Sequence, residues 1–173
     1  LKPRFMPVFL VLAGVASVCL YALVARDFLH FWVDDAGITF TFARNIAQGY
    51  GSVAHPGGER VEGFSSPAWM CLLAAAFRFG GNLFAVSQVL AFILALGTLA
   101  VLCLYAGWPR DGAGSIWPAA IVTMMTASQS AFVIWNQSGM ENSLYAFLLA
   151  LSIFLVVREG LDWTARPWSV LSL

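Results

Sequence analysis

Four stretches of this chain lack charged side chains and are separated by polar segments. They cover residues 5–25, 83–107, 116–135 and 144–157. A helix of about 20 residues is about 30 Å long, which matches the hydrocarbon core of a bilayer. The pattern therefore predicts an all-α integral membrane protein whose spanning helices cover residues 5–25, 83–107, 116–135 and 142–157. A further apolar run begins at residues 167–173, so we expect the N-terminal part of a longer transmembrane domain.

The first polar segment, residues 26–82, is much longer than the others and contains both histidines of the protein. Charged side chains are costly to place in lipid, so those beside a membrane gather where function needs them. Lys2 and Arg4 precede the first apolar run. The positive-inside rule then places the N-terminus in the cytoplasm and residues 26–82 on the opposite, external side.

Two further helices are predicted within this external segment. Apolar side chains recur at helical spacing in Ile38, Phe42 and Ile46, which predicts a helix that begins at Asp34-Asp35 and ends near Gly49. Residues 52–62 are predicted to form a loop or short hairpin that turns at Pro56-Gly57-Gly58. A second helix is predicted to follow, with Ser66 as N-cap and Pro67 at its first position.

The second of these helices determines the topology. Residues 67–79 form an apolar helix of only about 20 Å, which is short of the hydrocarbon core. We expect it to lie along or dip into the outer interface, and a short spanning helix is the alternative. If it does not cross, Arg110, Arg158 and Arg166 are cytoplasmic, as the positive-inside rule prefers. Glu141 then lies on the same side as Asp34 and Asp35.

The composition is typical of a membrane protein and argues against one class of partner. The chain is 60% hydrophobic and 10% charged, with a mean hydropathy of +0.80, whereas soluble domains are about 25% charged. The formal net charge is zero, which argues against a nucleic-acid partner. Cys19, Cys71 and Cys103 each lie within an apolar run, and their spacing predicts neither a disulfide nor a metal site.

Two groups of motifs resemble a known superfamily. The first lies in Trp32–Pro67 and the residues just after it. It reads Asp-Asp-Ala-Gly-Ile from Asp34, Ala-Arg-Asn-Ile-Ala-Gln-Gly from Ala43, Gly-Gly-Glu-Arg-Val-Glu-Gly from Gly57 and Ser-Ser-Pro-Ala-Trp from Ser65. The second reads Ser-Gly-Met-Glu-Asn-Ser-Leu from Ser138. Together they resemble the GT-C superfamily of glycosyltransferases that use polyprenyl-phosphate sugars, in particular the mycobacterial terminal arabinofuranosyltransferases and their bacterial relatives.

The resemblance implies a GT-C transmembrane helical bundle with interfacial helices in its first external loop. It also implies an inverting glycosyltransferase in the bacterial inner membrane, active on the extracytoplasmic side. The donor would be a polyprenyl-phosphate sugar and the acceptor a glycan, a lipid-linked saccharide or a protein. The motifs cover about a quarter of the chain, and later helices of such an enzyme lie beyond it.

Carboxylates are the expected catalytic groups. A sugar hydroxyl is a poor nucleophile until a carboxylate within hydrogen-bond reach accepts its proton. In the superfamily this base is an Asp of the first loop, so Asp34 and Asp35 are equal candidates. One of them could instead cap the helix that follows. Glu141 is the acid of the second motif, and we expect it to share one external cavity with the aspartates.

Four other residues are candidates for contacts with the substrate. Arg44 and Arg60 could bind the donor phosphate, with local ion pairs as the alternative. Glu62 and His55 could contact substrate or supply ligands to a divalent metal, but they lack the fixed spacing of a metal motif. Some relatives carry a Glu where this chain has Ser65. The sequence therefore requires no cofactor and leaves the metal unassigned.

A non-enzymatic function is the alternative. A membrane scaffold, or a transporter-like subunit that keeps the same helical framework, would carry the same apolar runs. Substitution of the acids separates the two, because an enzyme would lose turnover while keeping its fold.

Overall fold

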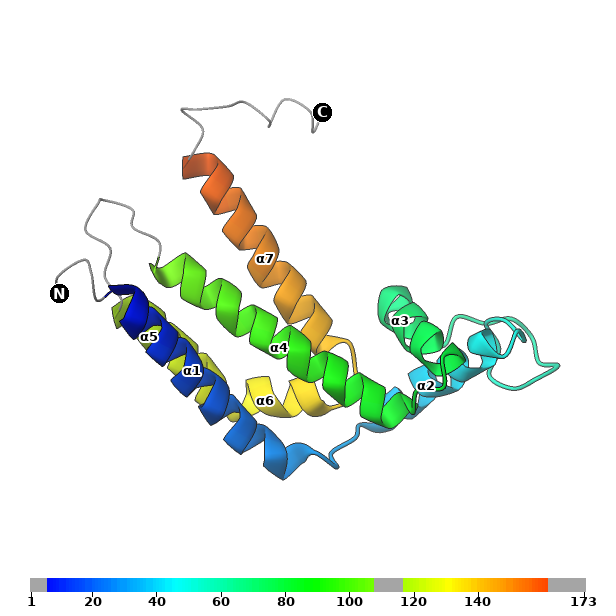
Figure 1. The fold of residues 1–173 in the computed structure, drawn as a ribbon. Coiled ribbons are helices and arrows are strands. Elements are labelled where there is room, and N and C mark those ends of the chain that lie inside the picture. The colour runs from blue at the N-terminus through cyan, green and yellow to red at the C-terminus, as the bar shows by residue number, and fades with distance from the viewer. Residues whose placement is uncertain (1–5, 108–116, 162–173) are drawn as a thin grey trace.

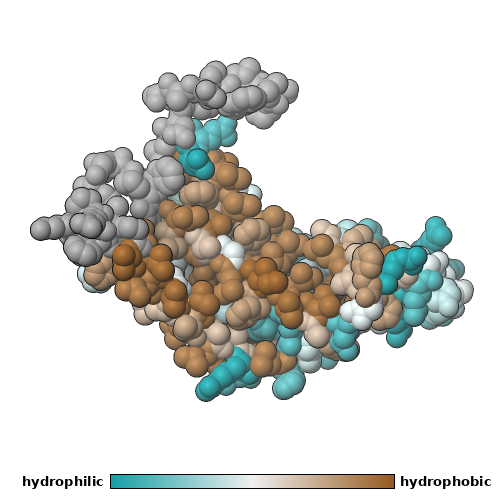
Figure 2. Space-filling model, viewed as in Figure 1, coloured by the Kyte–Doolittle hydropathy of each residue, from teal (hydrophilic) through white to brown (hydrophobic). Residues whose placement is uncertain are grey.

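The computed structural model describes residues 6–107 and 117–161, and the regular elements in this part of the chain are all helices (Figure 1). Its extended segments contribute one isolated antiparallel bridge, between Val53 and Arg60. Three helices are long and apolar enough to cross a membrane, over Val8–Phe28, Leu83–Ala106 and Asn142–Gly160. The chain thus has the helices of an integral membrane protein, and Figure 2 shows apolar residues covering much of their surface.

Three helices form the bundle that carries the rest of the fold. They are α1 (Met6–Ala25), α4 (Leu83–Gly107) and α5 (Trp117–Ser128). Small residues allow close helix packing in a membrane, and Ala25, Ala95 and Ala127 are buried in this bundle together with Tyr21, Leu99 and Val133. The rings of Phe92 and Phe132 lie against Tyr21 at centroid distances of 5.6 and 5.9 Å.

The predicted continuous helix over residues 116–135 is interrupted. Its residues form α5 and then α6 (Ser130–Gln137), bent by 58° with the break at Gln129. Gln129 is extended, with φ −72° and ψ 109°. The reason lies in three consecutive polar residues, since serine favours caps and turns over helix interiors. Indeed, the Ser128 hydroxyl bonds back to the Met125 carbonyl at 3.1 Å.

Another long helix, α7 (Asn142–Leu161), packs against α4 and diverges from it toward its own C-terminal end (Figure 1). Gly97 permits the contact, because a Cβ there would lie 2.8 Å from the Phe147 ring. The helix runs beyond the predicted 142–157 and includes Arg158. Lys2, Arg4, Arg110, Arg166 and the run at 167–173 lie outside the described residues.

A smaller helical unit lies at one end of the bundle. After the short 3₁₀ helix Arg26–Phe28, the chain forms α2 (Asp34–Ala47), a hairpin-like loop and α3 (Pro67–Arg78). Their shared core contains Phe40, Phe42, Ala43, Trp69 and Leu73. Ser66 caps α3 by accepting a hydrogen bond from the Trp69 amide at 3.4 Å, as the sequence predicts.

This unit leaves and rejoins the bundle at the same end. The chain departs where α1 ends and returns where α4 begins, and α6 and the start of α7 lie at that end as well (Figure 1). We call it the loop end. The helix α3 packs mainly against α2 and lies beside it, outside the bundle (Figure 1). Figure 2 shows hydrophilic residues gathered at this end of the molecule.

Candidate functional site

A polar cavity of about 350 Å³ opens at the loop end. Residues from three parts of the chain line it: Asp35, Ile38 and Thr39 of α2, Glu62, Gly63, Phe64 and Ser65 of the loop, and Met140 of the turn before α7. The first-loop motifs and the second acidic motif therefore meet at one place. Asp35 lines this cavity, whereas Glu141, the acid expected to share it, is not a lining residue.

Asp35 lines the cavity because of its rotational position on α2. The helix begins at Asp34, and its N-cap is Val33, which is extended and offers no capping side chain. Neither aspartate is therefore the N-cap. Both occupy the first turn, where the helix dipole favours acidic groups. Residues at i, i+3 and i+4 share a helix face, so Asp35, Ile38 and Thr39 line the cavity together, whereas Asp34 is exposed and is not a lining residue.

The loop that supplies Glu62 and Ser65 is held over α2. Ser52 and Val61 join its two arms, since the Val61 amide donates to the Ser52 carbonyl at 3.2 Å and the Ser52 hydroxyl to the Val61 carbonyl at 3.0 Å. A Cβ on Gly63 would lie 2.6 Å from the Phe42 ring. Only glycine fits this close approach, which brings the residues on either side of Gly63 to the cavity.

The turn between α6 and α7 is clamped to both α2 and α3. The Val33 amide donates to the Ser138 carbonyl at 3.2 Å, and the Trp69 indole donates to the Gly139 carbonyl at 3.0 Å. Gly139 has φ +84°, a conformation that glycine tolerates. These two hydrogen bonds fix the position of the next acid, Glu141, relative to the first-loop helices.

Glu141 lies behind the wall of the cavity. Its side chain is 5% exposed, and its Oε1 accepts a hydrogen bond of 2.5 Å from the Ser65 hydroxyl. Its Oε2 is buried and has no hydrogen-bond partner among the described residues. Buried polar atoms usually have partners, so this oxygen is a candidate acceptor for a group that is not part of the described chain.

The other predicted site residues divide into two groups. Glu62 lines the cavity with Asp35. Arg44, in the last turn of α2, and His55 and Arg60, on the hairpin-like loop, are exposed and are not lining residues. Among the residues that the structure describes, the lining thus contains two carboxylates and no basic side chain. Its apolar portion consists of Ile38, Phe64 and Met140, a suitable surface for the C–H face of a sugar ring.

Metal binding receives no structural support in the described part of the chain. No three His, Cys, Asp or Glu side chains gather there closely enough to hold a metal ion. Glu62 and His55, the two candidate ligands, are both exposed, and Glu62 alone lines the cavity.

Sequence reasoning did not assign Ser65, Thr39 or Met140 to the site. Ser65 was noted only as a departure from relatives, and its contact with Glu141 joins residues 76 positions apart. A function for Ser65 could have been suspected from the Ser-Ser-Pro motif. Ser66 is the N-cap in that motif, so the side chain of Ser65 is free for another contact. Thr39 and Met140 gave no comparable signal.

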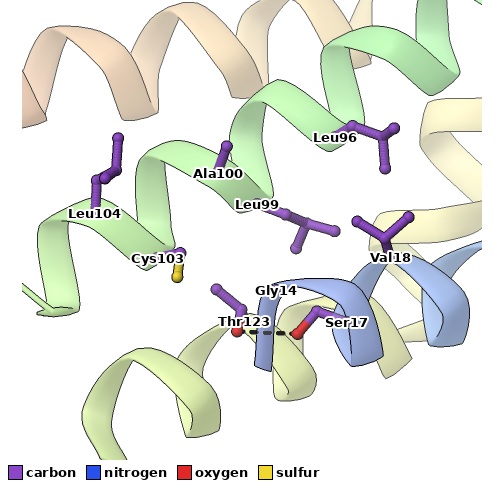
Figure 3. A pocket seen from close by; sticks show the side chains of 9 residues that line it. All are labelled: Gly14, Ser17, Val18, Leu96, Leu99, Ala100, Cys103, Leu104 and Thr123. Atoms are coloured by element: carbon purple, nitrogen blue, oxygen red, sulfur yellow. Dashed lines mark hydrogen bonds between the residues drawn. The ribbon is translucent and has the colours of Figure 1, made fainter. Parts of the chain in front are cut away.

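A second cavity, of about 300 Å³, lies between α1, α4 and α5 (Figure 3). Its lining is mainly apolar, and the exceptions are Ser17, Thr123 and Cys103. The Ser17 hydroxyl donates to Thr123 Oγ1 at 3.0 Å, and Thr123 in turn donates to the Ala119 carbonyl at 2.7 Å. Both hydroxyls are thus satisfied within the bundle, and none of the described residues that line this cavity is charged.

Comparison with known proteins gives no match to any family model, curated protein or solved structure. The motifs and the geometry of the polar cavity are therefore the features of this chain that bear on its function.

Proposed function

We propose that this chain is the N-terminal part of an inverting GT-C glycosyltransferase that moves a sugar from a polyprenyl-phosphate donor to a hydroxyl-bearing acceptor. The observation that carries the proposal is the meeting of Asp35 and the Ser65–Glu141 pair at one polar cavity, at the loop end of an apolar helical bundle. The motifs that bear these residues resemble those of the superfamily. The bundle and the short α2–α3 unit are compatible with its framework.

In this proposal Asp35 is the general base. It lies on the cavity surface and within reach of an acceptor hydroxyl seated there. As the acceptor oxygen attacks the anomeric carbon, its proton passes to the Asp35 carboxylate. The new glycosidic C–O bond forms while the bond between that carbon and the phosphate oxygen breaks, and the polyprenyl phosphate leaves with the electron pair. Proton transfer of this kind contributes about 10²–10⁴-fold to a rate.

The charge of the cavity bears on where each substrate binds. Asp35 and Glu62 make its surface acidic, and no basic side chain of the described residues lines it. A phosphate would be repelled there, whereas a neutral sugar would find hydrogen-bond acceptors and the ring of Phe64. We therefore assign the acceptor to this cavity and the donor phosphate to a position outside it. We further propose that Arg44 and Arg60, which lie outside the cavity at the edge of the α2–α3 unit, contact that phosphate.

We also propose on which side of the membrane the cavity lies. Lys2 and Arg4 favour a cytoplasmic N-terminus, and the loop end, where α1 finishes, then faces away from the cytoplasm. A polyprenyl-phosphate sugar in the outer leaflet would reach this end directly. The acceptor could be a glycan, a lipid-linked saccharide or a protein on the same side.

The test uses the full-length protein in proteoliposomes with a panel of radiolabelled polyprenyl-phosphate pentoses and hexoses. Release of polyprenyl phosphate and labelling of the acceptor are measured. We expect Asp35→Asn to lower the transfer rate by about 10²–10⁴-fold and the matched neighbour Asp34→Asn to lower it far less. Equal activity of both variants and the wild type would exclude Asp35 as the base. Absence of transfer by a folded wild-type protein would favour the scaffold alternative.

A further inference from the structure

Within the described part of the chain, Ser65 joins the buried acid Glu141 to the cavity. Its side chain is exposed and lines the cavity, while its hydroxyl donates at 2.5 Å to Glu141 Oε1 behind the wall. Glu141 itself is not a lining residue and is 5% exposed. A ligand in the cavity therefore meets Ser65 Oγ first, and its link to the Glu141 carboxylate runs through that hydroxyl.

We propose that Ser65 is a positioning residue that holds the Glu141 carboxylate in one orientation and couples it to whatever occupies the cavity. Hydrogen bonds to a charged acceptor are among the stronger ones in proteins. This one fixes Oε1 and leaves Oε2 as the unpartnered acceptor. Because the Ser65 hydrogen is engaged with Glu141, its oxygen presents only lone pairs to the cavity, and a ligand hydroxyl must donate to it.

The backbone on both sides of this hydrogen bond is already fixed. Ser65 precedes the N-cap Ser66, and α3 is anchored through the Trp69 indole to the Gly139 carbonyl. Glu141 follows Gly139 by two residues in the clamped turn. Catalytic constellations require positions held to within about 0.5 Å, and the shared anchor at Gly139 keeps the donor and acceptor of the Ser65–Glu141 bond in register. The hydroxyl then restrains the Glu141 side chain, including the rotation of its carboxylate.

The neighbouring serine provides a matched control. Ser66 has the same side chain, but it is buried and acts as the cap of α3. Because Ser66 has a structural function as the cap of α3, we expect Ser66→Ala to lower the stability of the protein more than Ser65→Ala does. A positioning function predicts that Ser65→Ala changes the Glu141 carboxylate, and that Ser65→Thr, which retains the hydroxyl, restores it.

The first measurement is independent of any reaction. Infrared spectra of the full-length protein, with ¹³C-labelled glutamate, are recorded for the wild type and for Glu141→Gln, and their difference isolates the Glu141 carboxylate band. We expect Ser65→Ala to shift this band, Ser65→Thr to return it and Ser66→Ala to leave it in place in the folded protein. An unchanged band in Ser65→Ala would overturn the inference.

The second measurement rests on the proposed function. In the transfer assay we expect Ser65→Ala to lower kcat by about 10- to 100-fold, the effect of one charge-assisted hydrogen bond, with a smaller change in KM and recovery in Ser65→Thr. A wild-type kcat in Ser65→Ala would overturn the positioning function. If the wild type transfers no sugar but the band shifts as expected, the link between Ser65 and Glu141 stands and the transferase proposal alone fails.

Discussion

Replacement of Gly139 by alanine tests the contact that brings the two motifs together. Gly139 has φ +84°, and a Cβ there would lie 3.0 Å from Ala36 Cβ, 3.1 Å from Trp32 Cε3 and 3.2 Å from Phe40 Cζ. An L-residue in the left-handed region costs about 1–2 kcal/mol, and overpacking costs about 1–3 kcal/mol. We therefore expect Gly139→Ala to lower the free energy of unfolding by about 2–5 kcal/mol.

Gly80 separates the two causes of this loss. It has nearly the same backbone conformation, with φ +86°, but a Cβ there meets no atom within 4 Å. Gly80→Ala should therefore cost only the conformational part, about 1–2 kcal/mol. Both variants are unfolded with SDS in mixed micelles, and tryptophan fluorescence reports the transition. Equal losses in the two variants would refute the packing of the Gly139 turn against α2.

Three further predictions concern other contacts. Trp69→Phe should destabilise the protein by about 1–3 kcal/mol, because it leaves the Gly139 carbonyl without its donor. The control Trp117→Phe, at a side chain 65% exposed, should change the stability by no more than about 0.5 kcal/mol. An unchanged stability of Trp69→Phe in the SDS titration would contradict this prediction. Tyr21→Phe removes the 3.1 Å partner of the Gln137 amide and should cost about 0.6–1.7 kcal/mol, with Tyr145→Phe as the exposed control in the same titration. With the native cysteines replaced by alanine, an impermeant maleimide should label Glu59→Cys from outside intact cells and Glu159→Cys only after permeabilisation. Labelling of both from outside would reject the proposed topology.

The positions of the apolar helices could be predicted from the sequence because each helix is bounded by polar or glycine residues. The chain forms a helix over Leu83–Gly107, where the sequence predicts one over 83–107. The cap at Ser66 was predictable for the same local reason. These features depend on neighbouring residues alone, so a reading along the chain can locate them.

The break at Gln129 has a local cause, whereas the composition of the cavity depends on more than local pattern. The prediction of one helix over residues 116–135 depends on the lack of charged residues and takes no account of the three polar residues at 128–130. In the structure these residues end α5. The choice of Asp35 over Asp34 as a lining residue follows from the rotation of α2, which turns Ala36 and Phe40 toward the Gly139 turn. Contacts between distant segments of this kind carry no signal in a single sequence.

The bend at Gln129 also determines how much apolar length the protein presents to lipid. At 1.5 Å per residue, α4 extends for about 37 Å, whereas α5 extends for about 18 Å. The 58° bend means that α6 adds only about 6 Å along the α5 axis. We therefore expect the described part of α5 together with α6 to present a shorter apolar length to lipid than α4 does, and a short apolar length is accommodated by thinning of the bilayer, by snorkelling of flanking residues or by oligomerisation.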